Sequence, residues 1–270
     1  MYCHALSVAS ISVTLCSCDN AKSHTDVIWT CFRTNTSEGW YCPAMTLIIG
    51  HRGASKAFKE NTIEAIQGAR EAGADWVELD IRRSLDGEIV VHHDPHTEAS
   101  ALIAATKASD LPSYIPTLAE ALEACGDMGV NIEIKNEEDE EDFDPEHQMV
   151  PRTIEVARAK MDRAKTLITS FDMGAINAVH DSDPAMPTGL LTSDPIGAEV
   201  SVGRAAAHDH VAINPSDEII TPRWVAAAEE AGLAVYVWTV DDHDRMVELA
   251  EWGVDGIITN VPAIAVQALR

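Results

Sequence analysis

Short apolar runs alternate with amphipathic stretches from Met45 to the end of the chain. The runs are rich in Val, Ile and Leu, as parallel strands buried on both faces are, and the stretches between them have the three-to-four-residue spacing of helices. Eight repeats of strand and helix are typical of a (β/α)8 barrel, an α/β fold of the TIM type. The predicted strands are Leu47–Gly53, Trp76–Ile81, Asn131–Lys135, Thr166–Phe171, Thr188–Thr192, Val211–Pro215, Ala234–Val240 and Gly256–Asn260.

Capping residues mark the starts of several predicted helices. Asn61 and Thr117 each precede an amphipathic stretch and have a glutamate three residues further on, which predicts two capping boxes. Thr221-Pro222 has the preferred order of cap and first helical residue. The first strand ends in His51-Arg52-Gly53 rather than in a glycine-rich phosphate loop, which argues against a doubly wound nucleotide-binding sheet.

One apolar run does not follow a helix. Glu88–His93 is joined to the second strand by Leu85-Asp86-Gly87, a connection too short for a parallel crossover. The two segments are therefore predicted to form an antiparallel hairpin with an Asp-Gly turn, a β-hairpin excursion after strand two of the barrel. Reflecting the sequence about this turn pairs His93 with Asp80. We therefore expect the hairpin to bring His93 to the mouth of the barrel.

Polar side chains gather at the carboxyl ends of the predicted strands, the edge at which barrels of this type carry their active sites. These residues are His51, Arg52, Glu78, Asp80, His93, Glu133, Lys135, Asp172 and Trp238. Alternation along a strand places Glu78 and Asp80 on one face, and Glu133 shares a face with Lys135. Buried strands rarely carry carboxylates that are neither paired nor bound to a metal. Three of them without a cysteine predict a hard divalent cation, Mg²⁺ or Ca²⁺.

The overall charge limits the possible partners. Acidic residues outnumber basic ones 44 to 19, which gives a net charge of −25. This charge repels nucleic acid and anionic membranes, so we expect neither nucleic-acid binding nor stable membrane insertion. It also repels an anionic phosphodiester, so Arg52 and Lys135 are candidates for binding phosphate. His51 and His93 are candidates for acid–base catalysis, because the ordinary pKa of histidine, about 6.5, lies near neutral pH.

Residues 1–44 differ from the rest of the chain, since they contain five of the six cysteines and show no clear period. Three interpretations remain open: an extension outside the fold, a lipoprotein-like signal near Leu15-Cys16-Ser17-Cys18, and a metal or disulfide cluster. No Lys or Arg precedes the apolar stretch of the signal, and Cys16-x-Cys18 has no partner pair at zinc spacing. We predict an extension over 1–44 and a catalytic domain over 45–270. A cytoplasmic location is expected, and a periplasmic or lipid-anchored one only with a true signal.

Several stretches resemble the glycerophosphodiester phosphodiesterase (GDPD) family. In family order, they are Gly50-His51-Arg52-Gly53, Glu60-Asn61-Thr62, Glu78-Leu79-Asp80, Val90-Val91-His92-His93-Asp94, Glu133-Ile134-Lys135, Ser170-Phe171-Asp172, Trp238-Thr239 and Gly253–Thr259. Each stretch alone is a weak signal, but together they are specific and extend from about Leu47 to Pro262.

This resemblance implies roles for the candidate residues. Glu78, Asp80 and Glu133 would bind the metal, and His51 and His93 would be the acid–base pair. Phosphate and substrate contacts would come from Arg52, Glu60, Lys135 and Trp238. The implied reaction is metal-dependent hydrolysis of a glycerophosphodiester, a small-molecule substrate, to an alcohol and glycerol 3-phosphate.

The chain departs from the family pattern at three places. Lys59 replaces a common proline, and Asn260 stands where the family often has aspartate. The usual Leu-x-Arg-Thr-Thr stretch after His-Asp is missing, and an Ala-rich segment, 95–113, takes its place beside His93. This last departure leaves the substrate preference open.

Three alternative functions remain. A lysophospholipase D-like or phosphoinositide-type enzyme would use the same residues on a lipid diester. A non-catalytic barrel would bind phosphodiesters without turnover. A carboxylate-pair glycosidase would leave the two histidines unexplained.

The remaining polar residues have simpler interpretations. His92, His96, His147, His180, His208, His210 and His243 are predicted to be rim or surface residues. The acidic run Glu137–Asp144 is predicted to be a solvated loop, with a cation-collecting lip as the alternative. Cys125 is expected to be inert core.

Overall fold

A computed structural model of the chain describes residues 4–8, 11–16, 29–33, 40–41, 45–193 and 196–270. It divides into two compact units, Met1–Met45 and Thr46–Arg270. In the first unit, strands β1 (His4–Val8), β2 (Ile11–Cys16), β3 (Trp29–Arg33) and β4 (Trp40–Tyr41) pair antiparallel in that order. Ser17 and Cys18 of the candidate signal lie outside the described residues. That residues 1–44 are separate from the fold stays a prediction.

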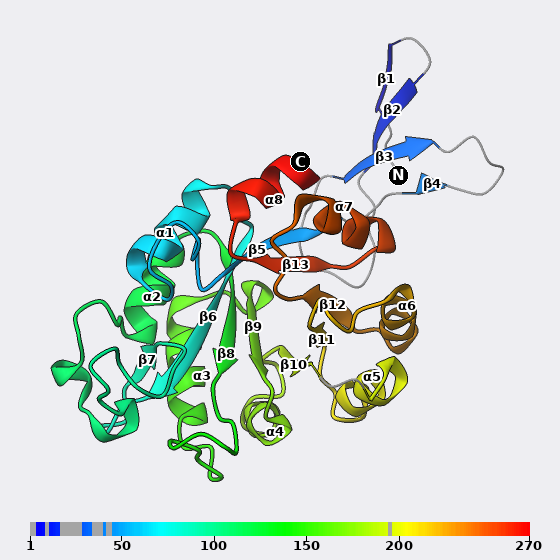
Figure 1. The fold of residues 1–270 in the computed structure, drawn as a ribbon. Helices are drawn as coiled ribbons and strands as arrows, with labels where there is room; N and C mark the ends of the chain where they lie inside the picture. The colour runs from blue at the N-terminus through cyan, green and yellow to red at the C-terminus, as the bar shows by residue number, and fades with distance from the viewer. Residues whose placement is uncertain (1–3, 9–10, 17–28, 34–39, 42–44, 194–195) are drawn as a thin grey trace. The chain divides into compact units, whose positions relative to one another are not determined.

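The second unit is a closed barrel of eight parallel strands, which confirms the predicted fold (Figure 1). Its closing strand β5 is hydrogen-bonded to both β6 and β13. The strands are β5 (Leu47–His51), β6 (Trp76–Arg83), β8 (Gly129–Ile134), β9 (Thr166–Ser170), β10 (Thr188–Thr192), β11 (Ala212–Pro215), β12 (Ala234–Val237) and β13 (Gly256–Thr259).

In the described part of this unit, eight helices surround the strands, and the main core lies between the two layers (Figure 1). The outward-facing Ile48 and Leu79 of neighbouring strands are fully buried against them. The helices are α1 (Ile63–Glu71), α2 (Leu118–Cys125), α3 (Val150–Lys160), α4 (Met173–Ser182), α5 (Ala198–Ala207), α6 (Pro222–Ala231), α7 (His243–Trp252) and α8 (Pro262–Leu269). Among the described residues, no helix combines the length and hydropathy needed to cross a membrane.

One of the two predicted capping boxes is correct. Thr117 caps α2, and the reciprocal bond from Glu120 is present. The prediction for Asn61 is wrong, because the N-cap of α1 is Thr62, whose hydroxyl accepts a bond from the Ala65 amide. Asn61 has a positive φ of 58° and its side chain is bonded to Asp80 instead. A polar side chain before a helix can thus serve a site rather than the helix.

The predicted hairpin is present, but its register differs by one residue. β7 (Ile89–Val91) pairs antiparallel with the carboxyl-terminal end of β6, with Ile81 opposite Val91. The His92 amide, not that of His93, is bonded to the Asp80 carbonyl, at 3.0 Å. The cause is the turn: Leu85-Asp86-Gly87 is a three-residue loop with Gly87 at φ 84°, which moves the centre of reflection.

The hairpin continues into a rim segment that has a small core of its own. The 3₁₀ turns η1 (Ile103–Ala105) and η2 (Ala108–Asp110) precede α2, and a third, η3 (Arg163–Lys165), precedes β9. Ile103 and Ile115 are buried together with Val90 of β7. This cluster fixes the segment beside the barrel mouth.

Candidate active site

A pocket opens at the carboxyl ends of the strands, where the sequence places the candidate residues. Its empty volume of about 400 Å³ includes open solvent at the mouth. One side is charged and the other is apolar or aromatic. The lining residues are His51, Arg52, Glu78, His93, Asn131, Glu133, Lys135, Phe171, Leu191, Trp238 and Ile258.

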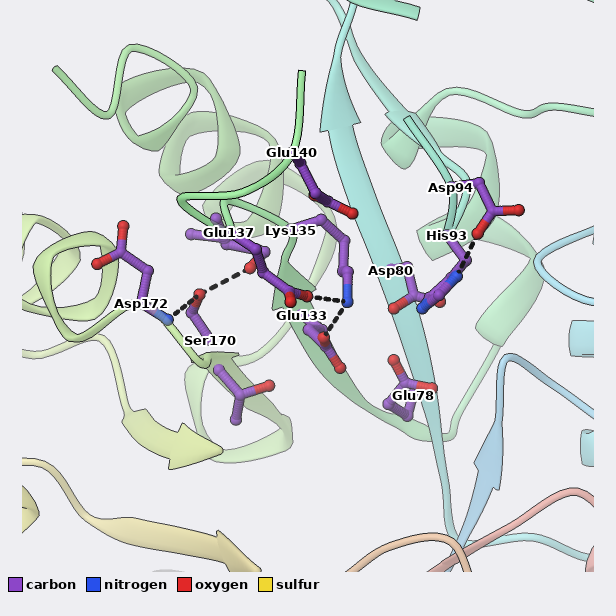
Figure 2. Close-up of polar contacts among 12 residues, drawn as sticks. Glu78, Asp80, His93, Asp94, Glu133, Lys135, Glu137, Glu140, Ser170 and Asp172 are labelled. Carbon is purple, nitrogen blue, oxygen red and sulfur yellow. Dashed lines mark hydrogen bonds and ion pairs between the residues drawn. The ribbon is translucent and has the colours of Figure 1, made fainter. Parts of the chain in front are cut away.

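Three carboxylates converge at the base of the charged side (Figure 2). Glu78 and Asp80 of β6 and Glu133 of β8 each offer an oxygen, and these oxygens lie within 4.8 Å of one another. All three side chains are buried, and Glu78 Oε1 and Asp80 Oδ1 have no hydrogen-bond partner among the described residues. Buried oxygens of this kind are costly without a cation. The arrangement suits a divalent metal with oxygen ligands.

Burial and mutual repulsion act on these carboxylates. Burial, followed by the neighbouring charges of Asp80 and Glu133, raises the pKa of Glu78 well above its usual range. Burial and Asp80 likewise raise the pKa of Glu133 to about 7. Burial also acts to raise the pKa of Asp80, but Arg52, His93 and Lys135 outweigh it and lower that pKa. Asp80 is therefore the carboxylate that stays charged most readily.

Arg52 lines the pocket together with Glu78 and Glu133. Its backbone amide donates to Glu78 Oε2 at 2.9 Å, and its Nε forms an ion pair with Asp80 Oδ2 at 3.1 Å. Nη1 donates to Glu60 Oε1 at 3.0 Å. Glu60 is not among the pocket-lining residues, so it meets the site through Arg52.

Lys135 directly follows β8, the strand that carries Glu133, and lies above Glu133 in Figure 2. Its Nζ donates to Glu133 Oε1 at 3.1 Å and to Glu137 Oε1 at 2.8 Å. Burial acts to lower the pKa of Lys135, but Glu133 and Asp80 outweigh it and raise that pKa. Lys135 therefore remains a buried cation in the pocket.

His51 ends β5 with its ring held by an amide. Nδ1 lies 2.7 Å from Asn260 Oδ1, while Asn260 Nδ2 donates to Asp241 Oδ2 at 2.8 Å. Because the carboxylate can only accept, the amide nitrogen of Asn260 faces Asp241 and its oxygen faces His51. The imidazole proton is thereby on Nδ1, and Nε2 lies 3.9 Å from Glu78 Oε2. Burial, followed by the charge of Arg52, lowers the pKa of His51.

His93 lies beside Asp80 (Figure 2), whereas His51 lies near Glu78. Figure 2 shows its ring beside Asp80, and its Nδ1 lies 2.7 Å from Asp94 Oδ1. Asp94 is therefore the partner that orients the ring of His93, whereas Asn260 orients the ring of His51.

The opposite wall of the pocket is aromatic. Phe171 and Trp238 pack edge to face with ring centroids 5.5 Å apart, and the indole Nε1 donates to the Asn214 carbonyl at 2.7 Å. Leu191 and Ile258 complete this wall. It offers contact area to the uncharged or organic part of a ligand.

Two asparagines belong to the site although the sequence analysis did not single them out. Asn61 Nδ2 donates to Asp80 Oδ2 at 2.8 Å and orients that carboxylate. Asn131 lines the pocket two residues before Glu133, and its Oδ1 accepts from Thr169. Alternation along β8 could have found Asn131, because it shares the face of Glu133.

Three predictions for the surrounding polar residues are wrong. The acidic run Glu137–Asp144 is not simply solvated, since Glu140 and Asp142 form ion pairs with the buried Arg82. His147 is half-buried and lies 2.8 Å from Asp172. His210 is buried between Thr188 and Asn177. In each case the partner comes from a distant part of the chain, which a local pattern does not reveal.

Two other minor predictions are confirmed. His92 is half-buried, at the rim, and its ring faces the His96 carbonyl at 3.2 Å. Cys125 is buried in α2, and burial raises the pKa of its thiol to about 12, so it is inert core.

A family model and a curated relative match most of this chain. The profile of the "Glycerophosphoryl diester phosphodiesterase family" matches residues 51–264. A glycerophosphodiester phosphodiesterase of Caldanaerobacter subterraneus subsp. tengcongensis is 31% identical over 245 residues, which cover 83% of this chain and 98% of the relative.

Solved structures of phosphodiesterases are also similar to this chain. A phosphodiesterase of Oleispira antarctica, in complex with the product sn-glycerol-3-phosphate, has a TM-score of 0.75 at 25% identity, covering 83% of this chain and 96% of that one. A glycerophosphodiester phosphodiesterase of Thermotoga maritima has a TM-score of 0.69 at 26% identity, covering 82% and 97%. The chain therefore belongs to the glycerophosphoryl diester phosphodiesterase family, a family of phosphodiester hydrolases.

Proposed function

We propose that this protein hydrolyses glycerophosphodiesters to an alcohol and glycerol 3-phosphate with the help of a divalent cation. The observation that carries the proposal is the placement of two differently held imidazoles, His51 and His93, around three converging carboxylates. The product named for the Oleispira antarctica phosphodiesterase supports the choice of substrate. All these residues lie within the predicted catalytic domain, 45–270, which we propose is the whole catalytic unit.

Glu78, Asp80 and Glu133 would hold the metal. All three are buried, and Glu78 Oε1 and Asp80 Oδ1 have no hydrogen-bond partner among the described residues, which fits a hard cation such as Mg²⁺ or Ca²⁺. When bound, such an ion supplies positive charge that polarises a phosphoryl oxygen. It would also offset the repulsion that raises the pKa of Glu78 and Glu133.

His51 fits the role of general base. Asn260 fixes the proton on Nδ1, so the Nε2 lone pair faces the pocket. The lowered pKa of His51 keeps the ring neutral near neutral pH. It can therefore take a proton from the nucleophile, a water or a hydroxyl of the substrate.

His93 fits the role of general acid. Its ring is held by Asp94 and lies beside Asp80 (Figure 2), whereas His51 lies near Glu78. A proton from His93 would neutralise the departing alkoxide. Arg52 and Lys135 would bind the non-bridging phosphate oxygens, and the Trp238 wall would contact the organic part of the substrate.

The test is an assay of glycerol 3-phosphate release from glycerophosphocholine and glycerophosphoethanolamine. Activity is expected to disappear on chelation and to return with Mg²⁺ or Ca²⁺. His51→Ala and His93→Ala are each expected to lower kcat about 10²- to 10⁴-fold. His243→Ala, at an exposed histidine of α7, is the matched control and should leave kcat unchanged.

Two results would contradict the proposal. One is full activity after exhaustive chelation, and the other is full activity in either histidine variant. Faster turnover of a lysophospholipid than of both soluble diesters would instead favour the lipid-specific alternative.

A further inference from the structure

Among the described residues, the largest fully buried side chain is a cation, Arg82 of β6. Its Nε donates to the backbone carbonyl of His93 at 2.7 Å. Its Nη2 donates to Glu140 Oε1 at 2.8 Å, and its Nη1 donates to Glu140 Oε2 and to both oxygens of Asp142 at 2.9 Å. The guanidinium thus connects His93 directly to the acidic run that follows β8.

His93 depends on such a connection because it lies beyond the hairpin. The β6–β7 ladder ends at the pair of Ile81 and Val91. Past this pair, the His92 amide reaches the Asp80 carbonyl, and then the His93 carbonyl receives the Arg82 bond. The guanidinium takes the place of the strand partner that His93 lacks.

The acidic run supplies the counter-charge that this position requires. A guanidinium without solvent exposure must have anionic partners, and Glu140 and Asp142 together occupy its outer N–H groups. The same run reaches the other side of the site, where Glu137 accepts from Lys135 at 2.8 Å. Two residues of the acidic run, Glu140 and Asp142, therefore serve an internal cation.

We propose that Arg82 is a positioning residue for His93, and that Glu140 and Asp142 are the counter-ions that hold Arg82 in place. This inference rests on the proposed function, in which His93 is the proton donor. Arg82 acts through the backbone of His93 and does not itself line the pocket. Loss of the arrangement would misplace the donor without removing it.

A misplaced proton donor has a recognisable kinetic effect. Choline leaves the phosphorus as a basic alkoxide, so its departure requires a proton from a general acid. The p-nitrophenolate ion is a stable anion and leaves without one. The activity on glycerophosphocholine should therefore fall far more than that on the p-nitrophenyl ester of glycerol phosphate. A general loss of structure would lower both activities alike.

The experiment compares two double variants of the full chain with equal loss of charge. Glu140→Gln with Asp142→Asn removes the counter-ions, and Glu138→Gln with Asp139→Asn changes two exposed neighbours in the same loop. For the first variant, kcat on glycerophosphocholine is expected to fall about 10- to 100-fold with KM within about 2-fold. Its kcat on the nitrophenyl ester should fall less than about 3-fold, and the control should match the unmodified protein on both substrates.

Arg82→Lys provides a second test, since it keeps the buried charge but loses the forked contacts. It should show the same selective loss, with circular dichroism confirming that it is folded. An equal loss on both substrates, or no loss, in whichever variants fold overturns the inference. The variant His93→Ala separates failure of this inference from failure of the proposed function. If His93→Ala is active, His93 is not the proton donor. If His93→Ala is inactive while the Glu140/Asp142 and Glu138/Asp139 double variants have the same kcat on both substrates, only the role of Arg82 is refuted.

Discussion

Single side chains around the site act mainly by orienting other side chains. Sequence patterns could identify Glu78, Asp80 and Glu133, because carboxylates on inward strand positions are unusual. They could not identify the role of Asn260, which appeared only as a departure from the family's aspartate. Its contacts to His51 and Asp241 bring together the ends of β5 and β13 and the loop after β12, so no local spacing reveals them.

Asn260 is therefore expected to control His51. Asn260→Ala removes the acceptor for Nδ1–H and should lower kcat about 10- to 100-fold. Asn260→Asp places a carboxylate there, which favours the imidazolium and raises the pKa of His51. The acid limb of the kcat/KM profile should then move to higher pH, because the base form appears later.

A pH–rate profile of each variant measures this. Ser55→Ala is the control, since the Ser55 hydroxyl also donates to Asn260 Oδ1 but does not touch His51. An unchanged acid limb in Asn260→Asp would show that His51 is not governed through this contact.

At the scale of elements, alternation and chain order predicted the strands, the helices and the hairpin. These patterns did not predict the register of the hairpin. A three-residue loop shifts the strand pairing by one residue relative to a two-residue turn, and the two have nearly the same sequence pattern. Helix α3 begins only at Val150, after a loop that follows the acidic run. There the chain first uses Asp144 and His147 to anchor the acidic run and Asp172.

The junction of β5 and α1 depends on one glycine. Gly53 has a φ of 88°, and a Cβ there would collide with the backbone of Ala65 in α1. Gly53→Ala is expected to cost about 2–5 kcal/mol, the sum of left-handed strain and overpacking. Gly87→Ala, at φ 84° with open space around it, is the matched control and should cost only about 1–2 kcal/mol.

Urea unfolding of the two variants tests the difference. Equal free energies of unfolding would mean that the close approach of α1 contributes nothing. Because Gly53 follows Arg52 directly, the first variant should also weaken phosphate binding, seen as a higher KM.

At the scale of the whole molecule, the stability of the barrel depends on pH through a buried histidine, His210. Burial, followed by the nearby His208 and His180, lowers the pKa of His210 to about 4. The unfolded chain, with an ordinary histidine pKa of about 6.5, binds this proton more readily than the folded one. Stability contributed by neutral His210 is therefore complete above pH 6.5 and is lost as the pH falls towards 4.

The free energy of unfolding should consequently fall by about 1–3 kcal/mol more in the unmodified protein than in His210→Gln between pH 7 and 4. Denaturant unfolding across this range provides the comparison, with His243→Gln as an exposed control. Parallel curves for all three proteins would show that His210 is not buried in its neutral form.

The strand β7 pairs with β6 but does not take part in closing the barrel, which has an evolutionary consequence. Because β5 joins β6 and β13 without β7, insertions or deletions between Pro95 and Pro116 leave every seam of the barrel intact. This rim can therefore diverge in length and composition while the chemistry beneath it is inherited unchanged. No residue of this stretch lines the pocket, so a change in its length would leave the pocket lining in place.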